Sequence, residues 1–166
     1  EFVAKILAAK EAKQDKNFLV IARIEALISG LGMQEALKRA DAYEKAGADA
    51  ILIHSKEKKP DEIFEFTESW KGSVPIVAIP TTYDSVKISD LYNNKIKMVI
   101  YANQTLRSAY TAMENLLKEM INAEKISDVK QKMSDMKEIF ELQEMYDVKT
   151  KEEELEAELK KLGYIN

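Results

Sequence analysis

The feature that most constrains the fold of this chain is a repeat of short apolar runs, each ending in polar residues and followed by a helical pattern. The four runs are Phe18–Ile24, Ala50–Ile53, Pro75–Ile79 and Met98–Tyr101. Apolar runs that alternate with helical patterns are typical of parallel βαβ units, whose strands are covered on both faces. The sequence therefore predicts four βα units with polar side chains at the carboxyl ends of the strands.

The carboxyl ends of the strands are the face on which (β/α)8 barrels build their active sites. Four βα units make half of such a barrel, so we predict an α/β fold of the (β/α)8 TIM-barrel type. Further helices predicted over residues 128–145 and 150–162 follow no strand and lie outside the repeat. We accordingly divide the chain into half of a barrel, residues 1–126, and C-terminal helices, residues 127–166, that pack on or exchange with a neighbouring subunit.

Composition excludes several classes of function. The net charge of −4 gives no basic footprint for nucleic acid, and no apolar run is long enough to span a membrane. The chain has no cysteine, so it forms neither disulfides nor thiolate metal sites, and a reducing cytoplasm is the default location. It begins within a predicted amphipathic helix, with neither an initiator Met nor a secretory signal, so we expect an internal fragment.

Arg23 and Glu25 are two residues apart at the end of the first run, so their side chains share one face. Barrel interiors are normally filled with branched apolar residues, so charges there need a reason. The guanidinium of Arg23 suits a carboxylate or phosphate of a ligand. The alternative is an internal ion pair that closes the mouth of the barrel.

His54, the only histidine, directly follows the second run. It could bind an anion or donate a hydrogen bond, although a lone histidine is more often a core or rim residue. Ser55 and Lys56 could add a hydroxyl and a cation, but Lys56 also begins a run of charges typical of a solvated surface. Asn103, after the fourth run, is a further polar candidate and fits the N-cap of the helix that follows.

Two kinds of residue expected in an enzyme are missing from the sequence pattern. No cluster of Asp or Glu at the strand ends would hold Mg²⁺, and no nucleophile stands beside a base. We therefore assign no catalytic residue and no metal ligand in this chain. Leu155, Leu159 and Leu162 form a narrow apolar seam, which fits a helix of a second subunit.

Three segments carry a resemblance to a known family: Ala22–Ala26, Glu35–Ala40 and Ala46–Lys56, with weaker echoes at Val77–Thr81 and Met98–Asn103. Their sequences resemble the phosphoenolpyruvate mutases, within the isocitrate lyase/phosphoenolpyruvate mutase superfamily. The resemblance spans about residues 17–145, is specific in its first half, and corresponds to the C-terminal half of the family's catalytic domain. It implies that the chain covers the last four units of the barrel.

The resemblance further implies an Mg²⁺-dependent enzyme that interconverts phosphoenolpyruvate and phosphonopyruvate, forming a carbon–phosphorus bond for phosphonate biosynthesis. It implies a dimer or tetramer in which a C-terminal helix is exchanged between subunits. Arg23 and His54 match residues that contact the anionic groups of the substrate, and Glu25 would support Arg23 or metal-bound water. The family's nucleophilic Asp, Mg²⁺ ligands and lid loop belong to the other half of the barrel, so we expect them outside this chain.

Three alternatives remain open from the sequence. Phosphonopyruvate hydrolase resembles the chain almost as well and differs mainly in the lid loop. Carbon–carbon lyases of the superfamily, acting on isocitrate or methylisocitrate, fit less well because they typically have Glu at the position of His54. A stand-alone half-barrel that serves as a non-catalytic assembly module would explain the missing acidic cluster, but it would leave Arg23 and His54 without a role.

Overall fold

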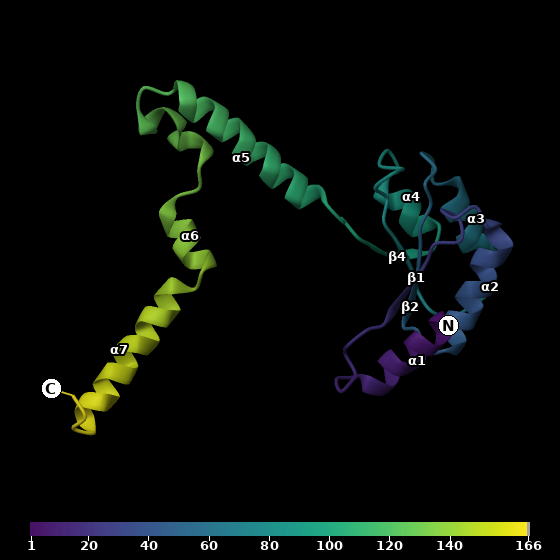
Figure 1. The fold of residues 1–166 in the computed structure, drawn as a ribbon, viewed down its shortest axis with the longest axis horizontal. Helices are drawn as coiled ribbons and strands as arrows, with labels where there is room; N and C mark the ends of the chain where they lie inside the picture. The colour runs from purple at the N-terminus through teal and green to yellow at the C-terminus, as the bar shows by residue number, and fades with distance from the viewer. Residues whose placement is uncertain (166) are drawn as a thin grey trace. The chain divides into compact units, whose positions relative to one another are not determined.

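The computed structural model describes residues 1–165 and contains two compact units, residues 1–105 and residue 106 onward. The first unit begins with helix α1 (Phe2–Ala12) and continues as four strands that alternate with helices. These are β1 (Ile21–Ile24), α2 (Gly32–Lys45), β2 (Ala50–Ile53), α3 (Asp61–Ser69), β3 (Ile76–Ala78), α4 (Ile88–Asn93) and β4 (Ile96–Val99) (Figure 1). The predicted βα repeat is confirmed.

The four strands form one parallel sheet in the order β1-β2-β3-β4. At its carboxyl edge the register aligns Ile24 with Ile53, Ile53 with Ala78, and Ala78 with Val99. Each strand thus lies beside the one before it in the sequence, which is how the strands of a (β/α) barrel are wound. Closure into eight strands stays a prediction.

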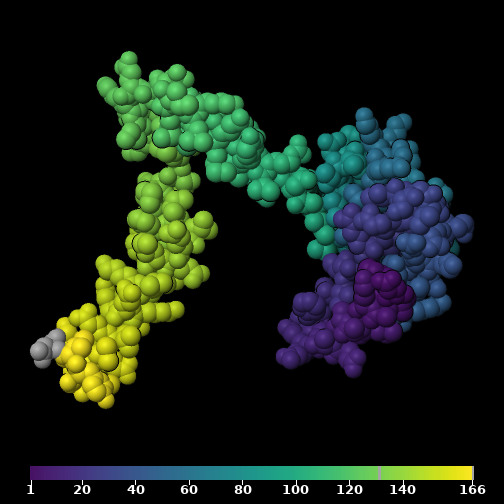
Figure 2. Space-filling model, in the orientation of Figure 1, coloured from purple at the N-terminus to yellow at the C-terminus, as the bar shows by residue number. Residues whose placement is uncertain are grey.

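Alternating side chains divide the sheet into two faces, which we call the helix-covered face and the opposite face. On the helix-covered face, strand residues such as Ile24, Ile51 and Ile53 pack in one core cluster with Ala36 and Ala40 of α2, Ile63 and Phe66 of α3, and Leu91 of α4. The opposite face carries a separate, smaller cluster of Ala50, Leu52, Val77 and Ile79. The first unit is a closely packed body, seen from purple to teal in Figure 2. Because the helices of this unit cover only one face of the sheet, β1 is not covered on both faces as predicted. The Arg23 side chain in that strand is exposed.

Helix α2 ends at a glycine, as its sequence predicts. Gly47 has a φ of +90°, a conformation that costs glycine little. Its N–H donates to the Glu44 carbonyl at 2.8 Å, and the Ala48 N–H donates to the Tyr43 carbonyl at 3.0 Å. This pair of bonds is the Schellman motif, and it turns the chain directly into β2.

Strand β1 is shorter than its apolar sequence predicts, because it begins at Ile21 and not at Phe18. Phe18 is held in a turn: its N–H donates to the Asp15 carbonyl at 3.1 Å, and its own carbonyl accepts from Lys13 Nζ at 3.1 Å. Hydrophobicity predicted the strand correctly, but the turn contacts take its first residues out of the ladder.

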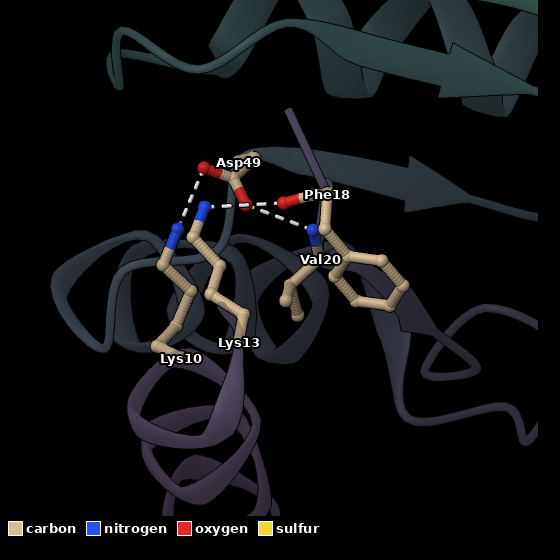
Figure 3. A network of polar contacts seen from close by, with 5 residues as sticks. All are labelled: Lys10, Lys13, Phe18, Val20 and Asp49. Carbon is tan, nitrogen blue, oxygen red and sulfur yellow. Dashed lines mark hydrogen bonds and ion pairs between the residues drawn. The ribbon is translucent and has the colours of Figure 1, made fainter. Parts of the chain in front are cut away.

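Just before β1 begins, the Asp49 side chain accepts a backbone hydrogen bond that a neighbouring strand would otherwise accept. The Val20 N–H donates to Asp49 Oδ2 at 2.8 Å, while the Asp49 N–H donates back to the Val20 carbonyl at 2.8 Å. Lys10 Nζ of α1 lies 2.7 Å from Asp49 Oδ1 (Figure 3). This network joins α1, β1 and β2 at the amino ends of the strands.

The second unit is helical, and the single helix predicted over residues 128–145 is wrong. After α5 (Gln104–Asn122) the chain forms a 3₁₀ helix, η1 (Ile126–Lys132), then α6 (Met136–Leu142) and α7 (Met145–Lys161). The Asp135 side chain accepts the Lys137 N–H and thereby begins α6, and Glu144, with a φ of +53°, separates α6 from α7. The predicted helix 150–162 lies within α7 apart from its last residue.

The second unit has little core of its own. No residue of α5 is buried, and among the residues described from 106 onward Val129 is the one buried hydrophobic residue. No helix within residues 1–165 is long and apolar enough to cross a membrane. The division at residue 126, which assigns α5 to the half-barrel, stays a prediction.

Candidate functional site

The carboxyl edge of the sheet brings together Arg23, Glu25 and His54. Because Ile24 aligns with Ile53, the next residues, Glu25 and His54, are neighbours just past the ends of β1 and β2. Alternation places these three side chains on the same face as Leu52, the opposite face, where helices α2 to α4 do not cover them. The sheet therefore assembles from distant parts of the chain the cluster that the sequence predicts.

Arg23 and Glu25 form an ion pair between Arg23 Nε and Glu25 Oε1. Their side chains remain 45% and 44% exposed, so solvent screens the pair and it contributes little to stability. The pair instead fixes the direction of the guanidinium, whose remaining N–H groups can donate to an anion. The ion pair that the sequence suggested is therefore present, and it leaves the Arg23 guanidinium accessible to a ligand.

His54 is half-buried, and its Nδ1 atom is buried without a hydrogen-bond partner. Burial lowers the pKa of His54 below its ordinary value, the Arg23 guanidinium lowers this pKa further, and Glu25 raises it. The imidazole is therefore mainly neutral at pH 7 and offers one N–H donor and one acceptor. A neutral imidazole beside an exposed guanidinium can hold two oxygens of a small anionic ligand.

Ser55, the neighbour of His54, is fully buried and does not face this cluster. Its hydroxyl donates to Glu62 Oε2 of α3 and accepts the Glu57 N–H at 3.0 Å. Its carbonyl accepts the Thr82 hydroxyl at 2.9 Å. Because successive side chains alternate, Ser55 points to the helix-covered face. Its hydroxyl is thus not presented beside the imidazole.

Within the described residues, neither Lys56 nor Asn103 makes a side-chain hydrogen bond or ion pair with Arg23, Glu25 or His54. Lys56 is exposed and lines a surface hollow with Glu57, Lys58, Lys59, Asp61 and Glu62, as expected of a solvated charge run. Asn103 precedes α5, but its side-chain Oδ1 accepts no hydrogen bond, so the predicted cap is wrong. The backbone N–H of Asn103 is instead satisfied by Gln104 Oε1 at 3.1 Å.

Sequence reasoning missed Glu62 and Thr82, which form hydrogen bonds with Ser55, and Tyr83, which anchors the loop that carries Thr82. Glu62 looked like an ordinary acidic residue in the first turn of a helix. Thr82 gave no signal, because its partner lies 27 positions earlier. Tyr83 is fully buried, and burial raises its pKa to about 12.

The described residues of this cluster present hydrogen-bond donors to an anion but no set of ligands for a metal ion. Within the described residues, no group of three or more His, Cys, Asp or Glu side chains is placed to hold a metal. Nor does any described hydroxyl or carboxylate of the cluster form a nucleophile–base pair. The cluster thus offers a guanidinium and an imidazole, groups whose chemistry suits a small, negatively charged molecule.

The family model described as phosphoenolpyruvate phosphomutase matches residues 1–121. This chain belongs to that family. Among curated relatives, it is 46% identical to the phosphoenolpyruvate phosphomutase of Tetrahymena pyriformis over 86% of this chain and 48% of the relative. It is 48% identical to the phosphonopyruvate hydrolase of Variovorax sp. (strain Pal2), over 86% of this chain and 50% of the relative.

Solved structures agree with this family assignment. The phosphoenolpyruvate phosphomutase of Streptomyces platensis subsp. rosaceus matches with a TM-score of 0.86 and 38% identity, over 93% of this chain and 54% of that one. A phosphonopyruvate hydrolase in complex with oxalate and Mg²⁺ matches with a TM-score of 0.84 and 46% identity, over 90% of this chain and 53% of that one. The chain spans about half the length of each of these four relatives, which belong to a TIM-barrel superfamily.

Proposed function

We propose that this family member forms the second half of a phosphoenolpyruvate mutase barrel, which interconverts phosphoenolpyruvate and phosphonopyruvate. The observation that carries the proposal is the placement of Arg23 in β1 and His54 directly after the adjacent β2, on one face, at the carboxyl edge of a parallel sheet. That edge is where barrel enzymes bind substrates. Both substrates carry a carboxylate and a phosphoryl group, so they need clustered donors of this kind.

In this proposal Arg23 and His54 bind and orient the substrate. The Arg23 guanidinium, held by Glu25, donates charge-assisted hydrogen bonds to one anionic group. Neutral His54 donates a single hydrogen bond to another oxygen. Glu25 acts through Arg23 and does not touch the substrate. Holding both anionic groups restricts the orientation of the carbon atom that receives or releases the phosphoryl group.

The second candidate is phosphonopyruvate hydrolase, which releases pyruvate and phosphate. The observation in its favour is the near-equal similarity: 48% identity to a hydrolase and 46% to a mutase over the same share of the chain. Arg23 and His54 would bind phosphonopyruvate in the same way in both reactions. The substrate-binding cluster therefore does not discriminate between the two activities.

Two further alternatives fit the structure less well. A carbon–carbon lyase is disfavoured by His54, where such lyases typically have Glu. A non-catalytic assembly module would explain the absence of a metal cluster among the described residues. It would leave an accessible Arg23 and the neighbouring His54 at the carboxyl edge without a role.

Two components of the proposal belong to other parts of the assembly. No group among the residues that the structure describes fits Mg²⁺, and a related hydrolase has been solved in complex with it, so we propose that the metal ligands lie outside this chain. Exposed apolar residues line α5 and α7, and we propose that they pack on a neighbouring subunit in a dimer or tetramer with exchanged helices. The examples with the clearest spacing are Leu106, Tyr110, Met113, Leu117, Leu155 and Leu162.

Phosphorus NMR decides between the candidate reactions. The product of the complete gene is incubated with phosphonopyruvate and Mg²⁺. A new signal of phosphoenolpyruvate supports the mutase, whereas inorganic phosphate with an equal amount of pyruvate identifies the hydrolase. If neither product forms, both enzymatic proposals are wrong. An accompanying calorimetric titration with oxalate then shows whether a carboxylate ligand binds at all.

A further inference from the structure

His54 has no side-chain hydrogen bond that sets its orientation within the described part of the chain. Its Nδ1 is buried and unpartnered, and the residue as a whole is half-buried. A histidine that must bind a ligand in one orientation needs its backbone fixed when its ring is not. The contacts that fix the backbone around His54 therefore bear directly on its function.

The residue before His54 is held by the sheet. Ile53 is fully buried on the helix-covered face, pairs with Ala78 of β3 and aligns with Ile24 of β1. Strand β2 ends there, so no ladder continues beyond it to hold the next residues. The backbone on the C-terminal side of His54 must therefore be held by contacts from outside the sheet.

Ser55 supplies that second restraint. Its side chain is fully buried and makes two hydrogen bonds, as donor to Glu62 and as acceptor from the Glu57 N–H at 3.0 Å. The first bond ties the loop to α3, and the second closes a tight turn immediately after His54. A buried hydroxyl with both functions satisfied is costly to displace.

The third bond ties Ser55 to the next βα unit. Its carbonyl accepts the Thr82 hydroxyl at 2.9 Å. Thr82 itself is exposed, but Tyr83 beside it is fully buried in the core, so the loop that carries Thr82 is anchored. Restraints from α3 and from the loop after β3 thus meet at one residue.

We propose that Ser55 is a positioning residue for His54: its hydrogen bonds to Glu62, Glu57 and Thr82 fix the backbone that directs the imidazole toward the substrate. This inference rests on the proposed function of His54 as a substrate-binding residue. It replaces the expectation that the Ser55 hydroxyl contacts the ligand. Ser55 acts through its neighbour and never touches the substrate.

The test compares Ser55→Ala with Thr67→Val in the product of the complete gene. Both changes remove a buried hydroxyl, but the Thr67 hydroxyl bonds only to the Phe64 carbonyl within α3, away from His54. Ser55→Ala is expected to raise KM for phosphonopyruvate about tenfold, the scale of one hydrogen bond, with a smaller change in kcat. Thr67→Val is expected to change neither constant.

Two readouts separate positioning from a merely structural role. In proteins with isotope-labelled histidine, the His54 ring signals are identified by their loss in His54→Gln, and they should shift or broaden in Ser55→Ala but not in Thr67→Val. In the His54→Gln background, Ser55→Ala should cause no further loss of kcat/KM, because both changes act on the same contact.

Several outcomes would overturn the inference. Ser55→Ala with unchanged His54 signals and KM, or with a full additional loss in the His54→Gln background, shows that Ser55 serves the fold alone. If Ser55→Ala does not fold, Thr82→Val decides, since it removes one bond at an exposed residue: unchanged His54 signals refute positioning. A wild-type protein without turnover refutes the proposed function, and the ring signals still test the positioning.

Discussion

Lys10 Nζ of α1 lies 2.7 Å from Asp49 Oδ1, while the other carboxylate oxygen of Asp49 accepts the Val20 N–H at 2.8 Å. One side chain thus closes the amino end of β2, completes the backbone pairing ahead of β1 and holds α1 in place (Figure 3). The pKa of Asp49 is lowered, first by the hydrogen bond from Lys10 and then by the one from Val20. The network lies at the amino ends of the strands, away from the carboxyl edge that carries Arg23 and His54. Residues at the amino ends of barrel strands serve stability.

Asp49→Ala should destabilise the fold without affecting ligand binding. The Val20 N–H loses its acceptor, which costs about 1 kcal/mol, and the partly exposed ion pair adds little. Urea unfolding of the variant measures this loss. Asp41→Ala, which removes an exposed partner of Lys45 on α2, serves as the control and should leave the free energy of unfolding within error. Equal stability of the two variants would contradict the role of Asp49.

Gly72→Ala should also destabilise the first unit. A Cβ at this position would lie 2.0 Å from Cζ2 of Trp70 and 2.1 Å from Oε2 of Glu44, whose other carboxylate oxygen accepts the Ser73 hydroxyl and the N–H groups of Ser73 and Val74. Relieving such overlaps costs about 1–3 kcal/mol. Thermal unfolding measures the loss, which should shrink in a Trp70→Leu background because the larger ring is gone. An undiminished loss there would place the strain elsewhere.

The pKa of His54 should respond in opposite directions to its two charged neighbours. Burial lowers this pKa below 6.5, Arg23 lowers it further and Glu25 raises it. Because a nearby cation disfavours the imidazolium, Arg23→Gln should raise the pKa, and Glu25→Gln should lower it. NMR titration of the His54 ring measures both shifts. Insensitivity to both changes would mean that the three residues are not neighbours.

Arg23→Ala should abolish most activity while leaving the fold intact. Loss of charge-assisted bonds to the substrate removes about 2–4 kcal/mol of transition-state stabilisation, seen in kcat/KM. The Arg23 side chain is 45% exposed, so its removal costs the core little. Arg39→Ala is the matched control, because Arg39 also pairs with a glutamate but lies on α2. Unfolding with unchanged substrate affinity would support a purely structural ion pair for Arg23.

Leu155→Glu should weaken subunit association. Leu155 is 56% exposed on α7, on the seam it shares with Leu159 and Leu162. A charge there would be buried in any helix–helix contact. Light scattering measures the mass of the assembly, which should fall relative to the unaltered protein. Lys151→Gln changes the net charge equally one turn away and should have no effect, and an equal mass of all three proteins would contradict the proposed interface.

Local sequence patterns predicted the elements of the first unit better than their ends. The apolar run Ala50–Ile53 coincides with β2, because Gly47 stops the helix before it and polar residues follow. The strand predicted from Phe18 begins at Ile21 instead, because Lys13 and Asp15 hold Phe18 in a turn. In the second unit, apolar residues at helical spacing hid the N-cap at Asp135, which begins a separate helix, α6.

The sequence by itself determined the βα repeat and the position of Arg23, Glu25 and His54 after buried strands, because both follow from local periodicity and from the order of polar and apolar residues. Only the tertiary structure decided which side chains are neighbours and on which face of the sheet each one lies. The strand register made Glu25 and His54 neighbours. Alternation turned the Ser55 side chain toward the helix-covered face, and the Thr82 hydroxyl bonds to the Ser55 carbonyl from 27 positions along the chain. Such contacts depend on how strands and loops meet in space, and no local pattern in the sequence records that.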